Sequence, residues 1–120
     1  MDLPCFENVD PGWWGIVERT VAKIKAIDPT CEIHVKEKFG LLRIRAASKT
    51  HHWSEFWEIE DAAELESSRT CELCGKPGHL RLDQSCLQTL CDGCAAVRGD
   101  NALKRIIIEA TEKKWMETHQ

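Results

Sequence analysis

Apolar and polar positions near the start of the chain follow the period of a helix. Apolar residues recur every three or four positions, at Trp14, Val17, Val21, Ile24 and Ile27. This spacing places one apolar stripe along a helix. Asp10-Pro11 is a typical helix start, and Asp28-Pro29 is a typical end. We therefore predict a helix over about residues 11–27.

The pattern then changes to alternation, which is typical of strands. One side of the alternating pattern is apolar, and the other carries His34, Lys36, Arg43 and Arg45. Gly40 lies between the two alternating segments and suits a tight turn. The segment therefore predicts a β-hairpin with one buried face, formed by Ile33, Val35, Leu42, Ile44 and Ala46, and one basic face.

Two more segments favour helices. Residues 53–67 are rich in Ala and Glu, with apolar Trp53, Phe56, Ile59 and Ala63 and an acidic outer side. Gly99-Asp100-Asn101 offers an N-cap for a last helix over about residues 101–117. Its main stripe is predicted to be Leu103, Ile107 and Ala110, with Ile108, Thr111 and Trp115 adjoining it.

Two CxxC pairs are separated by sixteen residues. Each pair brings two thiolates together, and this spacing is a strong signal for one structural zinc ion per chain. Gly75 and Gly93 fit turn positions that need positive φ, or a close approach of a backbone N–H to sulfur. Four thiolates complete a tetrahedron and leave no position for water or substrate, which argues against metal catalysis. The predicted ligands are Cys71, Cys74, Cys91 and Cys94.

Other arrangements of the cysteines are open at this point. The pairs could be redox-active, although neither has the strand-then-helix context of a thioredoxin-like site. His79 is a second possible ligand, and Cys86 is either a fifth thiol near the metal or a small buried apolar residue. Cys5 and Cys31 are expected to be unpaired thiols.

These elements predict a small α+β fold. We expect residues 1–68 to form a helix-hairpin-helix portion, residues 69–97 a zinc ribbon or knuckle, and residues 98–120 the C-terminal helix. The chain has 120 residues, of which 42% are hydrophobic and 30% charged, as in an ordinary globular protein. No apolar run approaches a membrane span, and no signal segment is evident, so a cytoplasmic protein that does not contact membranes is expected.

Two motifs, in this order, resemble a known family. They are Lys36-Glu37-Lys38-Phe39-Gly40-Leu41-Leu42-Arg43 and Cys71-Glu72-Leu73-Cys74-Gly75-Lys76-Pro77-Gly78, the latter followed by Thr89-Leu90-Cys91. The family comprises small, largely uncharacterised bacterial and phage proteins with a KEKFGGLR segment before a CxxCG…TLCxxH zinc knuckle. The resemblance covers about residues 12–94 and implies no particular activity.

The chain departs from this family pattern at three positions. Leu41 replaces a second glycine, which puts the family's turn geometry in doubt here. Cys86 stands near a usual tryptophan. Cys94 stands where the last ligand is usually histidine, and because Cys and His exchange readily as zinc ligands, this change supports the four-cysteine set.

Function is expected to be binding and not catalysis. The net charge of −4, the five tryptophans and the lack of a catalytic motif favour a protein-binding module, such as an immunity- or antitoxin-type inhibitor or a phage-encoded interaction protein. Adjacent Trp13 and Trp14 cannot both face one core, so one of them is a candidate interface anchor. The alternative is a nucleic-acid-binding accessory or regulatory protein using the basic hairpin face and Arg69, Lys76 and Arg81.

A degenerate HNH-like nuclease is a more remote alternative. Such enzymes place an Asp-His pair between zinc knuckles, whereas this chain has only His79 and Asp83 there.

The charge pattern makes a final prediction about the hairpin. Residues 53–67 carry six carboxylates and no Lys or Arg. We expect this acidic helix to lie beside Lys36, Arg43 and Arg45 and to neutralise them in mostly solvent-exposed pairs. The hairpin would then be a structural face and not a nucleic-acid platform.

Overall fold

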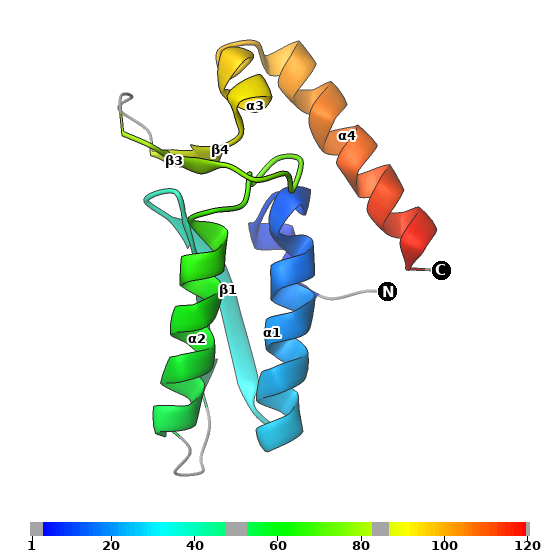
Figure 1. Ribbon diagram of the computed structural model, residues 1–120. Coiled ribbons are helices and arrows are strands. Elements are labelled where there is room, and N and C mark those ends of the chain that lie inside the picture. Colours follow the sequence, from blue (N-terminus) through cyan, green and yellow to red (C-terminus); the bar gives the residue numbers. More distant parts are fainter. Residues whose placement is uncertain (1–3, 48–52, 83–86, 120) are drawn as a thin grey trace.

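Two helices cover one face of a two-stranded hairpin, and a smaller cysteine-bearing unit is attached at one end (Figure 1). The computed structural model describes residues 4–47, 53–82 and 87–119. This arrangement confirms the predicted α+β fold.

The predicted first helix is present, but its first turn is tighter than expected. A short 3₁₀ helix, η1 (Pro4–Asn8), precedes a second, η2 (Pro11–Trp13), which leads into α1 (Trp14–Ile27). The side chain of Asp10 makes no capping hydrogen bond. The backbone N–H of Gly12 instead donates to the carbonyl oxygen of Glu72 at 2.9 Å. The start of this helix is therefore tied to the cysteine-bearing unit.

Both adjacent tryptophans are covered, which makes the expectation of an anchor at Trp13 or Trp14 wrong. Trp13 is 1% exposed, and its Nε1 donates to the carbonyl oxygen of Thr70. Trp14 is half-buried and stacks on Phe6 with 4.8 Å between ring centroids. Two separate packing partners, one on each side of the helix start, bury the two rings.

The hairpin forms with the predicted faces. Strand β1 (Glu32–Lys38) pairs antiparallel with β2 (Leu41–Ala47), and Val35 lies opposite Ile44. The turn uses positive φ at Phe39 and Gly40, so Leu41 begins the second strand without disturbing it. Val35, Leu42 and Ile44 are at most 3% exposed and pack against α1 and α2 (Trp53–Ser67).

Both edges of the hairpin have backbone groups that are hydrogen-bonded to side chains from other elements. On the β1 side, the Asn8 side chain donates to the Val35 carbonyl oxygen at 2.9 Å. On the β2 side, two side chains of α2 accept from backbone N–H groups: Ser67 Oγ from Leu42, and Glu60 Oε2 from Ala46. Capped edges resist pairing with another strand.

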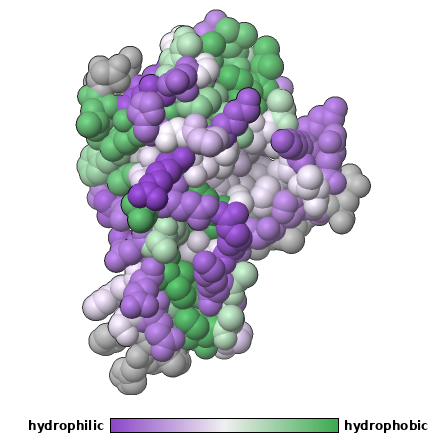
Figure 2. Space-filling model, in the orientation of Figure 1, coloured by the Kyte–Doolittle hydropathy of each residue, from purple (hydrophilic) through white to green (hydrophobic). Residues whose placement is uncertain are grey.

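The last helix, α4 (Asn101–Thr118), projects away from the body of the molecule (Figure 1). Ile107, Ile108 and Trp115 pack against the rest of the molecule, whereas Leu103 is 44% exposed. The predicted main stripe of this helix is therefore correct only at Ile107, because Leu103 and Ala110 are exposed and the adjoining residues Ile108 and Trp115 make the other contacts. Apolar residues are accordingly visible on the surface where α4 begins (Figure 2).

Among the described residues, no helix has the length and apolar character needed to cross a bilayer.

Candidate metal centre and neighbouring surfaces

The first CxxC pair lies on a tight knuckle. An isolated bridge joins Thr70 to Pro77, and the N–H of Cys71 donates to the Lys76 carbonyl oxygen at 2.8 Å. The N–H of Gly75 folds back onto the Cys71 carbonyl oxygen at 2.9 Å. Gly75 has a φ of +81°, which confirms the expected turn glycine. The knuckle points both thiols of the pair to one side.

The second pair is built differently. A short hairpin of β3 (His79–Arg81) and β4 (Gln88–Leu90) leads into α3 (Asp92–Ala96), whose N-cap is Cys91. The Cys91 Sγ accepts from the Cys94 N–H at 3.4 Å. Among the described residues the glycines with positive φ are Gly40 and Gly75. Of the two expected reasons for Gly93, positive φ is therefore wrong, because Gly93 lies inside the first turn of α3.

The four predicted thiols converge. The Sγ atoms of Cys71, Cys74, Cys91 and Cys94 lie within 4.8 Å of one another, and those of Cys74 and Cys91 are 3.6 Å apart. Two of the residues are buried, and two are half-buried. The cluster can hold one metal ion with four sulfur ligands.

Electrostatics oppose the ionisation of all four thiols of this cluster at once. Burial, reinforced by the neighbouring thiols, raises the pKa of Cys94 and raises that of Cys74 to about 11. Burial also opposes ionisation of Cys91, but hydrogen bonds, led by that from the Cys94 N–H, lower its pKa to about 7. One thiolate forms readily and suppresses ionisation of its neighbours, so four thiolates need a bound positive charge.

A buried carboxyl group supports the knuckle. Glu72 is 5% exposed, and its carboxyl oxygens accept from the Gln88 side chain at 3.0 Å and from the Thr89 N–H at 3.4 Å. Burial raises the pKa of Glu72 to about 7, against the effect of these hydrogen bonds. This group joins the knuckle to β4, and the sequence alone did not indicate that role.

Of the other candidate residues of the module, the structure describes His79, and this residue does not join the cluster. His79 is exposed on β3 and is absent from the four-residue set. Cys86 and Asp83 lie outside the described residues, as does the side chain of Cys5. Cys31 is a buried free thiol, 2% exposed, which donates to the Ala47 carbonyl oxygen.

Three close contacts attach the cysteine-bearing unit to the helical body. The first is the Gly12–Glu72 hydrogen bond described above. In the second, the Thr89 hydroxyl donates to the Gly40 carbonyl oxygen at 2.6 Å. The third is the indole hydrogen bond from Trp13 to Thr70. Sequence patterns do not reveal contacts of this kind, because the partners are far apart along the chain.

The hairpin and α2 are neighbours, as predicted, but their ion pairs are less exposed than expected. Arg43 Nε lies 2.8 Å from Glu64 Oε1, with both side chains about 30% exposed. Arg45 Nη1 lies 3.5 Å from Glu60 Oε1, and the Glu60 side chain is only 5% exposed. Within the described part of the chain, Lys36 has no ion pair. Neutralisation of the basic face is therefore partial.

The outer face of α2 exposes a tryptophan. This face comprises the exposed residues Ser54, Trp57, Glu58, Asp61, Ala62 and Leu65. Trp57 is 61% exposed and Leu65 is 54% exposed. They lie two turns apart, about 12 Å along the helix axis. The sequence pattern placed Trp14, Trp53 and Trp115 on apolar stripes and gave Trp57 no specific role. The signal available was its position on the acidic side of the helix.

No known protein family, curated protein or solved structure matches this chain in the comparisons. The family resemblance drawn from the two motifs therefore stays a sequence prediction.

Proposed function

We propose that this chain is a non-enzymatic protein-binding module whose cysteine-bearing unit is held by one structural zinc ion. The outer face of α2 is the binding surface, and a protein with a basic surface is the partner. The exposed Trp57 carries this proposal.

Zinc is the metal that the ligand set favours. Four cysteine ligands at this spacing are typical of structural zinc. A tetrahedron with Zn–S bonds of about 2.3 Å has edges of about 3.8 Å, close to the 3.6 Å between the sulfurs of Cys74 and Cys91. Zinc would stabilise the unit. The filled ligand shell would leave no open position for a reaction, which supports a binding role over an enzymatic one.

Trp57 supports protein binding because a large exposed aromatic side chain has no role in the fold. Tryptophan is enriched among the residues that dominate interface energies, and such residues are usually surrounded by a polar rim. Glu58 and Asp61 supply that rim, and no ion pair within the described residues occupies either. Carboxylates on the rim would steer a basic partner toward the indole ring, as an inhibitor of a nuclease toxin requires.

Quantitative affinity capture from the native host tests this proposal. The full chain, Trp57→Ala and Ile106→Ala are used as baits in parallel. Ile106 is a matched control, because it is 60% exposed on α4. We expect the full chain and Ile106→Ala to capture a basic protein. With that protein purified, Trp57→Ala should weaken binding about 30-fold, the loss typical of a hot spot.

Two results would contradict the proposal. Trp57→Ala could capture the same proteins as the unchanged chain, or Ile106→Ala could weaken binding as much as Trp57→Ala. Circular dichroism of all three proteins checks that the substitutions leave the fold intact.

A further inference from the structure

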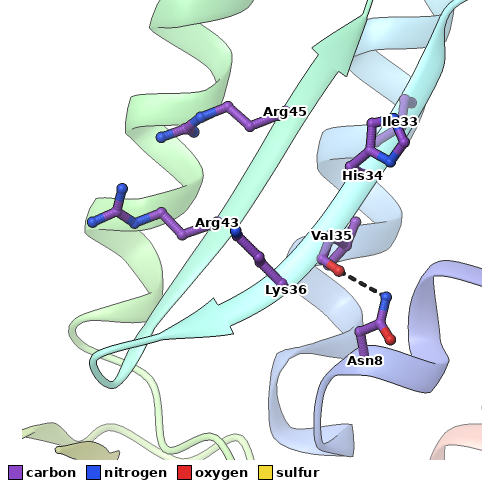
Figure 3. A pocket seen from close by; sticks show the side chains of 7 residues that line it. All are labelled: Asn8, Ile33, His34, Val35, Lys36, Arg43 and Arg45. Atoms are coloured by element: carbon purple, nitrogen blue, oxygen red, sulfur yellow. Dashed lines mark hydrogen bonds between the residues drawn. The ribbon is translucent and has the colours of Figure 1, made fainter.

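A trough of about 720 Å³ lies on the hairpin face that α1 and α2 leave uncovered (Figure 3). His34 and Lys36 of β1 line it together with Arg43 and Arg45 of β2. Asn8 of η1 borders the trough on one side, and the two arginines extend toward α2 on the other. The trough is therefore basic along its floor and bounded on both sides.

The basic face works against hairpin stability. Lys36 lies directly opposite Arg43. Like charges opposite one another destabilise a strand pair. Glu64 and Glu60 offset the two arginines from the side, and Glu32 lies on the same face at its far end. Among the described residues, Lys36 and Lys38 have no carboxylate partner. The fold itself does not account for this surplus of positive charge.

The chemistry of the trough favours a phosphate chain over an acidic peptide. Peptides that bind sheets usually add a strand at an open edge. Both edges of this hairpin are capped, by Asn8 on one side and by Ser67 and Glu60 on the other. A peptide lying flat on the face would lack the main-chain hydrogen bonds that an added strand makes at an open edge. Phosphates need only the cationic side chains. Side chains on one face of a strand are two residues apart, which is about 7 Å. The phosphates of an extended polynucleotide can match this spacing.

An exposed aromatic ring lies at the end of the basic face. Phe39 is 63% exposed at the hairpin turn, and Lys38 Nζ lies 5.6 Å from the centroid of its ring. Cationic grooves combined with aromatic rings are typical of proteins that bind single strands, because unpaired bases stack on the rings. Base pairs of a duplex are not available for such stacking.

We propose that the trough binds single-stranded nucleic acid. Lys36, Arg43 and Arg45 contact successive phosphates, and one unpaired base stacks on Phe39. The residues that the sequence suggested for the cysteine-bearing unit, Arg69, Lys76 and Arg81, do not line this trough. This site does not include the outer face of α2, so its failure would leave the proposed protein-binding function intact.

Fluorescence anisotropy with a labelled oligodeoxythymidine of about 16 nucleotides tests the proposal on the full chain. Lys36→Glu is compared with Lys113→Glu, which makes the same charge change at an exposed position on α4. We expect Lys36→Glu to weaken binding at least tenfold and Lys113→Glu to have little effect. The slope of log K against log salt should become shallower by about 0.7 for each phosphate that the variant no longer neutralises. Phe39→Leu should weaken binding about fivefold or more without changing that slope.

Any of four results would overturn the proposal. The unchanged chain could fail to bind the oligonucleotide at low salt. The two lysine variants could weaken binding equally, which would indicate a general charge effect. Polyglutamate could bind as tightly as the oligonucleotide, or a duplex of the same length could bind more tightly than the single strand.

Discussion

At Gly12 the backbone of the helical body passes close to the backbone of the cysteine-bearing unit. A Cβ atom added there would lie 2.2 Å from the carbonyl oxygen of Cys71 and 2.5 Å from the carbonyl carbon of Glu72. Both are backbone atoms beside a proposed metal ligand, so they cannot move aside as a flexible side chain would. Glycine at this position is therefore required by packing.

We expect Gly12→Ala to lower the free energy of unfolding by about 1–3 kcal/mol, the usual effect of overpacking. Urea denaturation measures the change. Gly93→Ala is the control, because a Cβ atom at Gly93 would have no neighbour within 4 Å. Alanine inside α3 should be neutral or stabilise by about 0.5–1 kcal/mol. Equal stability of Gly12→Ala and the unchanged chain would contradict the close approach.

At the scale of elements, α4 is attached to the body from its middle to its C-terminal end. Ile107 and Ile108, near the middle of the helix, pack on the cysteine cluster. Near its end, the Trp115 ring makes edge contacts with Phe6 and Trp14 at 5.4 and 6.0 Å. The His119 ring stacks on Trp115, and its Nε2 lies 3.2 Å from Glu18 Oε1. None of the residues of α4 is fully buried.

We expect Trp115→Ala to free the C-terminal half of α4 while leaving the rest of the fold in place. Two aromatic pairs at about 0.5–1.5 kcal/mol each suggest a local loss of about 1–3 kcal/mol. Hydrogen exchange should show at least tenfold faster exchange of backbone amides in residues 112–118. Met116→Ala is the control, because Met116 is the next residue and is 55% exposed. Similar exchange in the two variants would show that the aromatic contacts do not hold the helix.

At the scale of the whole molecule, the chain has two separate apolar cores. The larger core joins η1, α1, the hairpin and α2. The fully buried residues of the smaller core are Cys71, Leu73, Leu90 and Cys94. So small a core cannot offset the conformational entropy of ordering the chain around it, and a metal bound by four thiolates can supply the difference. The two cores should therefore respond differently to loss of the metal.

We expect a strong zinc chelator to abolish amide protection in β3, β4 and α3 while α1, β1, β2 and α2 remain protected. Hydrogen exchange with mass spectrometry resolves these segments. Elemental analysis should find about one zinc per chain in the unchanged protein and in Cys31→Ser, and much less in Cys74→Ser or Cys91→Ser. Equal zinc content in all of these proteins, or unchanged protection after chelation, would mean that the four thiols do not hold a structural metal.

The sequence by itself was sufficient to predict the long helices, the hairpin and the set of four cysteines. Helical and alternating periods depend on backbone geometry within a few residues, so the hairpin and the acidic helix were predicted close to their observed bounds. Spacing of two residues within each CxxC pair likewise brings two thiols together locally. The convergence of the two pairs was predicted from the hypothesis of one shared metal ion, and the four thiols do lie together.

Only the tertiary structure decided which surfaces are covered. Trp13 and Trp57 both occupy positions near the start of a predicted helix, yet Trp13 is buried in the larger core and Trp57 is exposed. Lys36 and Arg43 share one face of the hairpin, yet only Arg43 lies within reach of a carboxylate on α2. The exposure of a side chain and its ion pairs depend on which distant segment packs against its face. Local periodicity does not identify that segment. The candidate binding surfaces therefore emerge from packing between elements, whereas the elements themselves follow from local sequence.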